Sequence, residues 1–291
     1  MRIVLSNLFF GGLTGSEISS YELAKELAKR GHDVIVTPLK NKTPFLTEKV
    51  EALGVSVQNL DQIDMDFNPD ILICGQAPVA KITLKIFPGV PAVEFVRSEF
   101  QEIEPPLLNK RIKKYICNRP SVQEKVIASD KIKEEDTVVI WNGVDYDRFD
   151  IGPPDPNRQP KRVVFVGGAN HIRIPAMKHL VEMTREKGWI AKFVSSGRQD
   201  FMNESHVEVV DGGWDIEKVL EDSDYTAGIL FGRTTIEGLV AQRPGYIYQV
   251  DWGGNIHAID YVPVPPDRTI FSIETHTDEV LGVIDEVLTM E

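Results

Sequence analysis

Residues Phe9 to Val36 read FFGGLTGSEISSYELAKELAKRGHDVIV, and this stretch determines the expected fold. An apolar strand ends in two glycines, and apolar residues at helical spacing then occupy Ser16 to Arg30. Thr14 and Glu17 match a capping box at the start of this helix. Gly31 ends the helix, and the apolar run HDVIV reads as a second strand. Strand, helix and strand in this order predict a parallel pair of strands.

The same alternation of short apolar runs and helical patterns continues along the chain. Strand candidates in the first half are DILICG, PAVEFV and TVVIW, and those in the second half are RVVFVGG, WIAKFV, HVEVVD, YTAGILFG and GYIYQVD. Helical stretches separate most of these runs. The pattern predicts an α/β fold with two doubly wound, Rossmann-like sheets.

A proline-rich polar segment, Asp150 to Lys161 (DIGPPDPNRQPK), interrupts the periodicity. We interpret it as an interdomain linker, so the expected domains are residues 1–155 and 156–291. The stretch from Val250 to Asn255 (VDWGGN) is expected to form a glycine turn before a short helix. A final helix is expected from Thr277 to Met290, in a position where it can pack back on the first domain.

Composition excludes several classes of function. The 291 residues carry a formal net charge of -12, which argues against nucleic acid or a strongly anionic membrane as the main partner. The two cysteines, Cys74 and Cys117, lie in apolar runs without zinc-ligand spacing and are interpreted as buried, reduced thiols. No apolar run approaches the length that is needed to span a membrane. The apolar N-terminus is interpreted as a strand rather than a signal peptide. We therefore expect a cytoplasmic protein.

The glycine turn before the first helix has two interpretations. Glycine permits a sharp turn and the close approach of a ligand, and the free N–H groups of a helix start attract a phosphate. A plain tight turn explains the same residues. The spacing GGLTG is not the dinucleotide fingerprint G-x-G-x-x-G, and no acidic residue closes the second strand, so NAD is not expected.

Four stretches, in order along the chain, resemble the retaining glycosyltransferases with the GT-B fold, in particular the large glycogen-synthase-like and mannosyltransferase-like group. The first is the glycine turn with its helix. The second is VIWNGVDYDRF, Val139 to Phe149, near the expected domain boundary, and RVVFVGG then opens the second domain. The last is FGRTTIEGLVAQRPGYIYQVDWGG, Phe231 to Gly254, which is most similar to a short-chain branch of the group.

The resemblance implies two domains facing across a cleft that holds a nucleotide-diphosphate sugar. The second domain would hold the nucleotide, with Glu237 bonding the ribose hydroxyls. Trp214 lies where the family places the base, and a core or lid role suits it equally. The implied donor-binding residues are Gly12, Gly15, Ser16, Gly167, Gly168, His171, Gly232, Arg233 and Glu237.

The sequence departs from the family pattern at three places. Ile229 stands where the family block often begins with glutamate. Gly168 and Ile174 stand where an arginine and a lysine neutralise the diphosphate, and Arg173 is the expected substitute. Arg97 replaces a histidine and is too basic to act as a general base. We expect it to hold an anionic acceptor or a phosphate, with a surface or salt-bridging role as the alternative. Both arginines are the implied catalytic residues.

The implied reaction is sugar transfer with retention of configuration, in which the enzyme stabilises the departing diphosphate and that phosphate helps to deprotonate the acceptor. Neither a cofactor nor a metal is expected. The two D-x-D triplets, Asp64–Asp66 and Asp145–Asp147, are the only hint of a metal-dependent alternative.

Two other functions remain open. One is a non-catalytic relative that binds a nucleotide sugar or acts as a partner subunit, which the departures favour. The other is a sugar-nucleotide epimerase or hydrolase of the same architecture. The acceptor is not readable from the sequence: a small molecule, a glycan end and a lipid-linked glycan all fit.

Overall fold

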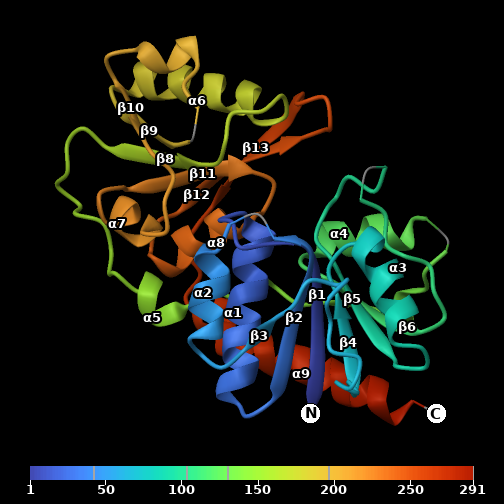
Figure 1. Cartoon of the computed structure of the whole chain (residues 1–291). Coiled ribbons are helices and arrows are strands. Elements are labelled where there is room, and N and C mark those ends of the chain that lie inside the picture. Colours follow the sequence, from blue (N-terminus) through green and yellow to red (C-terminus); the bar gives the residue numbers. More distant parts are fainter. Residues whose placement is uncertain (42, 103, 130, 196, 291) are drawn as a thin grey trace. The chain divides into compact units, whose positions relative to one another are not determined.

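The computed structural model describes residues 1–41, 43–102, 104–129, 131–195 and 197–290. The chain forms two compact units. The N-terminal unit comprises Met1–Gly143 with Ser272–Glu291, and the C-terminal unit comprises Val144–Phe271 (Figure 1). The division expected between residues 155 and 156 therefore falls inside the C-terminal unit.

A seven-stranded parallel sheet forms the centre of the N-terminal unit. Its strand order is β3-β2-β1-β4-β5-β6-β7, so the direction of winding reverses between β1 and β4. Every residue of β4 and β5 is buried, as expected for central strands that helices cover on both faces. The strands are β1 Arg2–Phe10, β2 Asp33–Asn41, β3 Ser56–Val57, β4 Ile71–Cys74, β5 Ala92–Val96, β6 Ile112–Cys117 and β7 Thr137–Val139.

The helices of this unit follow the predicted alternation. The capping box predicted from Thr14 and Glu17 is confirmed at the start of α1. The helices are α1 Gly15–Lys29, α2 Phe45–Glu51, α3 Ala77–Ile86, α4 Pro120–Ile127, the 3-10 turn η1 Glu134–Asp136 and α9 Ile273–Thr289.

The last helix, α9, belongs to the N-terminal unit although it ends the chain (Figure 1, red). Arg30, the C-cap residue of α1, forms an ion pair with Asp278, and its Nη2 donates to the carbonyl of Glu274 at 2.9 Å. His276 lies 2.7 Å from the carbonyl of Trp141 through Nδ1. A Cβ at Gly143 would lie 2.6 Å from Cβ of His276, so the glycine of the NGVD segment permits this close packing.

The C-terminal unit contains a six-stranded sheet of order β10-β9-β8-β11-β12-β13. All strands are parallel except the edge strand β13, which pairs antiparallel with β12. The elements are α5 Tyr146–Phe149, β8 Arg162–Val166, α6 Arg173–Lys187, β9 Ile190–Val194, η2 Asp200–Asn203, β10 Val207–Val210, α7 Ile216–Glu221, β11 Tyr225–Ile229, α8 Arg233–Val240, β12 Gly245–Val250, β13 Ile256–Val262 and η3 Thr269–Phe271.

The prediction of a short helix after VDWGGN is wrong, because the chain forms the strand β13 there. Asp251 and Asn255 close a hairpin: the N–H of Asn255 donates to Oδ1 of Asp251 at 2.9 Å. Gly254 adopts a φ of +82° in this turn. The segment IHAIDYV, in which Ile256, Ile259 and Val262 are β-branched, then continues as an edge strand.

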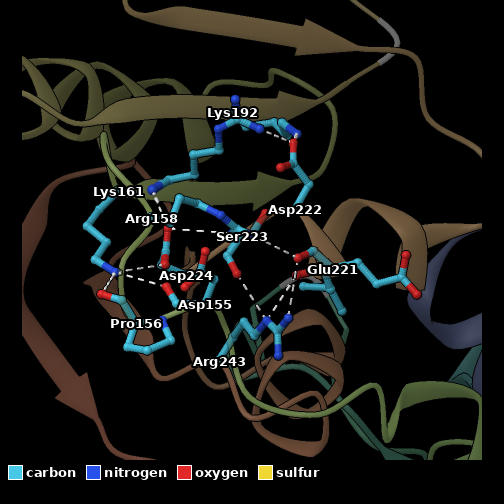
Figure 2. Close-up of polar contacts among 12 residues, drawn as sticks. Asp155, Pro156, Arg158, Lys161, Lys192, Glu221, Asp222, Ser223, Asp224 and Arg243 are labelled. Atoms are coloured by element: carbon cyan, nitrogen blue, oxygen red, sulfur yellow. Dashed lines mark hydrogen bonds and ion pairs between the residues drawn. The ribbon is translucent and has the colours of Figure 1, made fainter.

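The segment Asp150–Lys161, predicted to be an interdomain linker, lies within the C-terminal unit. Polar contacts hold it there (Figure 2). Nζ of Lys161 donates to Oδ1 of Asp224 at 3.3 Å, and Arg243 donates to the carbonyl of Gly152. Burial lowers the pKa of Arg243 to about 10. Prolines interrupt helical periodicity here without making the segment a flexible connection.

Both cysteines are free and buried, as predicted. Burial raises the pKa of Cys74 and of Cys117 to about 12, so neither thiol is a reactive thiolate at neutral pH. Within the described ranges, no helix combines the length and the apolar character that crossing a membrane requires.

Candidate functional site

The first strand-to-helix turn of the C-terminal unit runs from Gly167 to Arg173. Gly167 follows β8 with a φ of +144°, a conformation that residues with a side chain rarely adopt. A Cβ at this position would lie 3.1 Å from Nε of Arg173. The side chain of Arg173 therefore packs against the backbone at the carboxyl end of β8. Gly168 is exposed in the same turn.

Arg173 carries an uncompensated charge at the start of α6. Its backbone N–H donates to the carbonyl and to Oδ1 of Asn170, both at 3.0 Å. Its guanidinium forms no ion pair with any residue in the part of the chain that the structure describes, and burial lowers its pKa. This cation lies beside a glycine and at the start of a helix of fifteen residues. Such surroundings favour the binding of an anion.

His171 lies in this turn and meets a second loop. The ring of His171 packs edge-on against Trp252, with 4.8 Å between the centroids. A Cβ at Gly254 would lie 2.6 Å from the carbonyl oxygen of His171, so this glycine permits the loops after β8 and β12 to touch. Trp252 and Gly254 were not among the predicted site residues. Their signal in the sequence was the glycine pair of VDWGGN, which matched a plain connection equally well.

The turn from β11 to α8 has an unusual backbone. Leu230, directly after Ile229, adopts a φ of 54°, which is rare for a residue with a branched side chain. Its N–H donates to the carbonyl of Tyr248 at 2.9 Å, so the neighbouring strand holds this conformation. Gly232 then occupies the N-cap position of α8. Such strain is often found where a chain must position side chains for binding.

Arg233 and Glu237 form a buried ion pair on α8. Nε of Arg233 lies 2.8 Å from Oε1 of Glu237, and the two residues are 8% and 6% exposed. Burial raises the pKa of Glu237, and Arg233 opposes this shift. The resemblance implied that both residues bind the donor, with Glu237 at the ribose. Their spacing of four residues on one helix was the overlooked sign that they pair with each other.

A cavity of about 130 Å³ opens beyond the ends of β9 and β10. Its lining residues are Ser195, Gly197, Arg198, Val209 and Asp211. It is a concave polar site on the same edge of the sheet as the turns of Gly167 and Gly232, because the strands there run parallel.

Trp214 follows β10 and is half-buried. The guanidinium carbon of Arg148 lies 4.3 Å from the centroid of its ring. Arg148 also forms an ion pair with Glu217 at 2.6 Å. One face of the indole is thus covered from within the unit, so any stacked ligand must use the other face.

The glycine turn of the N-terminal unit contains a carboxylate of the chain itself. The N–H of Gly12 donates to Oε1 of Glu17 at 2.9 Å, and the hydroxyl of Thr14 donates to Oε2 at 2.6 Å. Glu17 is 2% exposed. Gly15 is the first residue of α1, and the hydroxyl of Ser16 lies 3.3 Å from that of Thr14. The capping residue Glu17 therefore occupies part of the predicted phosphate seat.

Arg97 lies directly after β5 with most of its guanidinium buried. Its Nε and Nη1 atoms are buried and have no hydrogen-bond partner among the described residues. Cζ lies 4.7 Å from the centroid of the Phe95 ring. Burial lowers its pKa to about 10, so it remains a cation at neutral pH. The alternative role of a surface or salt-bridging arginine does not fit this environment.

Both D-x-D triplets have local structural roles. Oδ1 of Asp64 accepts the N–H of Asp66 at 2.9 Å, and Asp145 caps α5 by accepting the N–H of Arg148 at 3.3 Å. In the described ranges, no group of three or more His, Cys, Asp or Glu side chains is placed to hold a metal ion.

Solved structures share this architecture over the whole chain. A glycosyltransferase from Rickettsia africae ESF-5 is 15% identical, with a TM-score of 0.71, and the match covers 100% of this chain and 99% of the other. Anabaena HepE, determined in complex with UDP and glucose, is 14% identical, with a TM-score of 0.72 and coverage of 98% and 100%. The chain has the GT-B fold.

Other GT-B structures are similar as well. The pneumococcal O-GlcNAc transferase GtfA, determined with UDP and GlcNAc, is 10% identical, with a TM-score of 0.67 and coverage of 99% of both chains. A UDP-GlcNAc 2-epimerase from Neisseria meningitidis matches less well, with 9% identity and a TM-score of 0.53 over 100% of this chain and 95% of the other. No family model matches the sequence, and no curated protein matches it either. The predicted fold class, two Rossmann-like domains of the GT-B type, is confirmed.

Proposed function

We propose that this protein is a glycosyltransferase that moves a sugar from a nucleotide-diphosphate sugar to an acceptor, with retention of anomeric configuration. The unpaired guanidinium of Arg173, packed against Gly167 at the start of α6, carries this proposal. Two structures of the same fold, HepE and GtfA, were determined with UDP, which makes UDP the first candidate nucleotide. The donor is a substrate, and no cofactor is proposed.

In the proposed reaction, the bond between the anomeric carbon and the diphosphate oxygen breaks while the acceptor oxygen bonds to that carbon on the same face. Arg173 and the N–H groups at the start of α6 stabilise the charge that develops on the departing diphosphate. The acceptor hydroxyl passes its proton to an oxygen of that phosphate. No carboxylate nucleophile is needed in this scheme.

The nucleotide would lie along the carboxyl edge of the C-terminal sheet. We assign the cavity lined by Ser195 and Asp211 to the base, and Glu237 to the ribose hydroxyls. The ion pair with Arg233 then serves to orient the Glu237 carboxylate rather than to hold phosphate. Exposed His171 and Gly168 would face the diphosphate beside Arg173.

Two further parts of the proposal concern conditions. Transfer is proposed to proceed without a metal, because Arg173 already offers a cation at the site of the leaving group. A cytoplasmic location is proposed because both cysteines are free thiols.

A calorimetric titration tests the proposal. UDP, GDP, ADP and dTDP are titrated into the protein with and without magnesium. We expect one nucleotide to bind without metal and Arg173→Ala to weaken it at least about tenfold, in line with the loss of a charged hydrogen bond. Arg185→Ala is the matched control, because Arg185 lies at the other end of α6 with an exposed side chain. Equal affinity in wild type and Arg173→Ala would refute the role of this arginine.

A turnover assay then separates the rival functions. The protein is incubated with nucleotide sugars of the preferred base and a panel of acceptors, and products are analysed by NMR. Transfer with an unchanged anomeric configuration supports the proposal, and an inverted product contradicts retention. Epimerised donor would indicate the epimerase alternative. Nucleotide binding without any turnover would indicate a non-catalytic relative.

A further inference from the structure

The edge strands of the two sheets differ in length. Among the described residues, β3 has two residues, β7 has three and β10 has four, whereas β13 has seven. An edge strand presents unpaired backbone N–H and C=O groups to which a further strand can bind, and short edge strands limit such pairing. The edge formed by β13 is therefore the exception in this molecule.

The sequence of β13, IHAIDYV, lacks the usual protection of an edge strand. It contains no lysine, arginine or proline, and Asp260 is its one carboxylate. Its central residues, from His257 to Tyr261, are all exposed. In the part of the chain that the structure describes, β12 is the only strand that pairs with β13 (Figure 1). The outer edge of β13 thus remains available to another strand.

One face of β13 continues a row of aromatic side chains. Tyr261 stands opposite Tyr246 of β12, with 5.5 Å between the ring centroids. The ring of Tyr225 in β11 follows at 5.7 Å from that of Tyr246. Tyr261 and Ile259 lie on the same face of the strand and are 54% and 38% exposed. Tyrosine is enriched in the cores of protein interfaces, so this face suits contact with another protein.

The strand is complementary to a second copy of itself. Twofold symmetry pairs the two copies antiparallel and places one residue opposite the same residue of the other copy. With Ile259 at the axis, all seven residues of each strand are paired. Ile256 of each copy then stands opposite Val262 of the other, His257 opposite Tyr261, and Ala258 opposite Asp260. No charged side chain directly faces a like charge in this register.

The neighbouring symmetric registers are less favourable. An axis at Asp260 would place two carboxylates directly opposite each other, which is destabilising. An axis at Ala258 would pair only residues 256–260 of each strand. The register about Ile259 combines the longest overlap with the absence of this repulsion.

We propose that β13 is a dimerisation strand: two copies of this chain pair antiparallel through β13 about a twofold axis at Ile259. The two six-stranded sheets then form one continuous sheet, and the two aromatic rows meet across the axis. Each copy carries a net charge of -12, so long-range repulsion opposes association and added salt should strengthen it. This dimer requires neither the nucleotide site nor the transfer reaction of the proposed function.

Analytical ultracentrifugation of the full chain tests the proposal. Wild type should change from monomer to dimer as its concentration rises, with a dissociation constant that falls as salt is added. Ile259→Lys places two lysines opposite each other at the axis and should weaken association at least about tenfold. Ile270→Lys is the matched control, because Ile270 lies in the same unit, is 43% exposed and undergoes the same change of charge. It should dimerise as wild type does.

Three results would overturn the proposal. The first is a wild type that stays monomeric over the whole range of concentrations. The second is a dimer of unchanged affinity in Ile259→Lys, which would place the contact elsewhere. The third is a dimer that dissociates as salt is added, because it would require opposite charges across the contact and the paired strands place none directly opposite.

Disulfide cross-linking tests the register and does not depend on the folding of the lysine variant. Ile259→Cys should form a covalent dimer on oxidation, because its two thiols stand opposite each other at the axis. Ala258→Cys and Asp260→Cys are the controls and should cross-link much less. Cys74 and Cys117 add no background, because both are buried and have a pKa raised to about 12. Faster cross-linking at position 258 or 260 than at 259 would contradict the proposed axis and overturn the inference.

Discussion

In each unit a glycine turn connects the first strand to the helix that follows it, yet the two turns hold opposite charges. In the N-terminal unit, the carboxylate of Glu17 accepts the N–H of Gly12 and caps α1. In the C-terminal unit, the guanidinium of Arg173 lies against Gly167 and forms no ion pair with a carboxylate of the described residues. A carboxylate satisfies the partial positive charge of a helix start, whereas an arginine adds to it. The charged residue at the start of the helix, more than the glycines, therefore decides whether such a turn attracts an anion.

A second contrast concerns buried carboxyl groups. Glu237 of the C-terminal unit is paired with Arg233. Glu94 of the N-terminal unit is buried as well, but among the described residues its hydrogen-bond donor is the backbone N–H of Leu107, at 3.2 Å to Oε1 and 2.9 Å to Oε2. Burial accordingly raises the pKa of Glu94 to about 8. Arg233 opposes the rise in the pKa of Glu237, whereas Glu94 has no such opposing cation and is largely protonated at neutral pH.

The largest effect is expected from breaking the buried pair. Arg233→Met leaves the charge of Glu237 unpaired, which should lower the free energy of unfolding by about 3 kcal/mol at pH 7. The pKa of Glu237 is already raised by burial and should rise further in the variant. Protonation then favours the folded state, so the loss should shrink as pH falls toward 4.5. Urea unfolding at several pH values measures this.

The double variant Arg233→Met with Glu237→Met serves as the control. It removes both charges and should recover most of the lost stability. If it is as unstable as the single variant, the packing of Arg233, rather than its charge, is what matters.

Next in size is the removal of the capping carboxylate. Glu17→Ala leaves the N–H of Gly12 and the hydroxyl of Thr14 without their acceptor, so the unfolding free energy should fall by about 2 kcal/mol. Glu51→Ala, at the exposed end of α2, should change it by less than about 0.5 kcal/mol. Equal effects in thermal unfolding would show that the carboxylate does not organise this turn.

A smaller effect is expected at the glycine that contacts Arg173. Gly167→Ala forces a side chain into a φ of +144° and against Nε of Arg173, at a cost of about 1 to 2 kcal/mol. In Gly188→Ala, the added Cβ has no heavy atom within 4 Å. The variant should lose only about 1 kcal/mol of stability, because alanine is strained at a φ of +65°. Only Gly167→Ala should also weaken nucleotide binding in calorimetry. Unchanged affinity in that variant would separate the turn from the binding site.

The last predicted effect is at Glu94, and its size depends on pH. Because the pKa of Glu94 is raised to about 8, its contribution to stability is complete below about 4.5 and is lost as pH rises through 8. Glu94→Gln keeps an acceptor for Leu107 without the charge. Its stability should be close to that of wild type at pH 5, and it should become several kcal/mol more stable than wild type as pH rises through 8 to 9. Parallel curves for the two proteins from pH 5 to 9 would contradict this.

Local patterns predicted much of the fold and less of the site. The capping box at Thr14 and the alternation of strands and helices were readable because each depends on neighbours within a few residues. The strand after VDWGGN was missed because an antiparallel edge depends on pairing with β12. The proline-rich segment looked like a linker because its anchors, Asp224 and Arg243, are distant in sequence.

The sequence by itself determined the two Rossmann-like units, since the period of apolar residues dictates which segments are strands and which are helices. It also placed the candidate residues at the ends of strands. Only the tertiary structure decided which charges are compensated. Glu17 accepts hydrogen bonds from its own turn, and Glu237 pairs with Arg233. Arg97 and Arg173 have no carboxylate at ion-pair distance in the described part of the chain. The reason is physical, because the energy of a charge depends on burial and on neighbours brought together by folding.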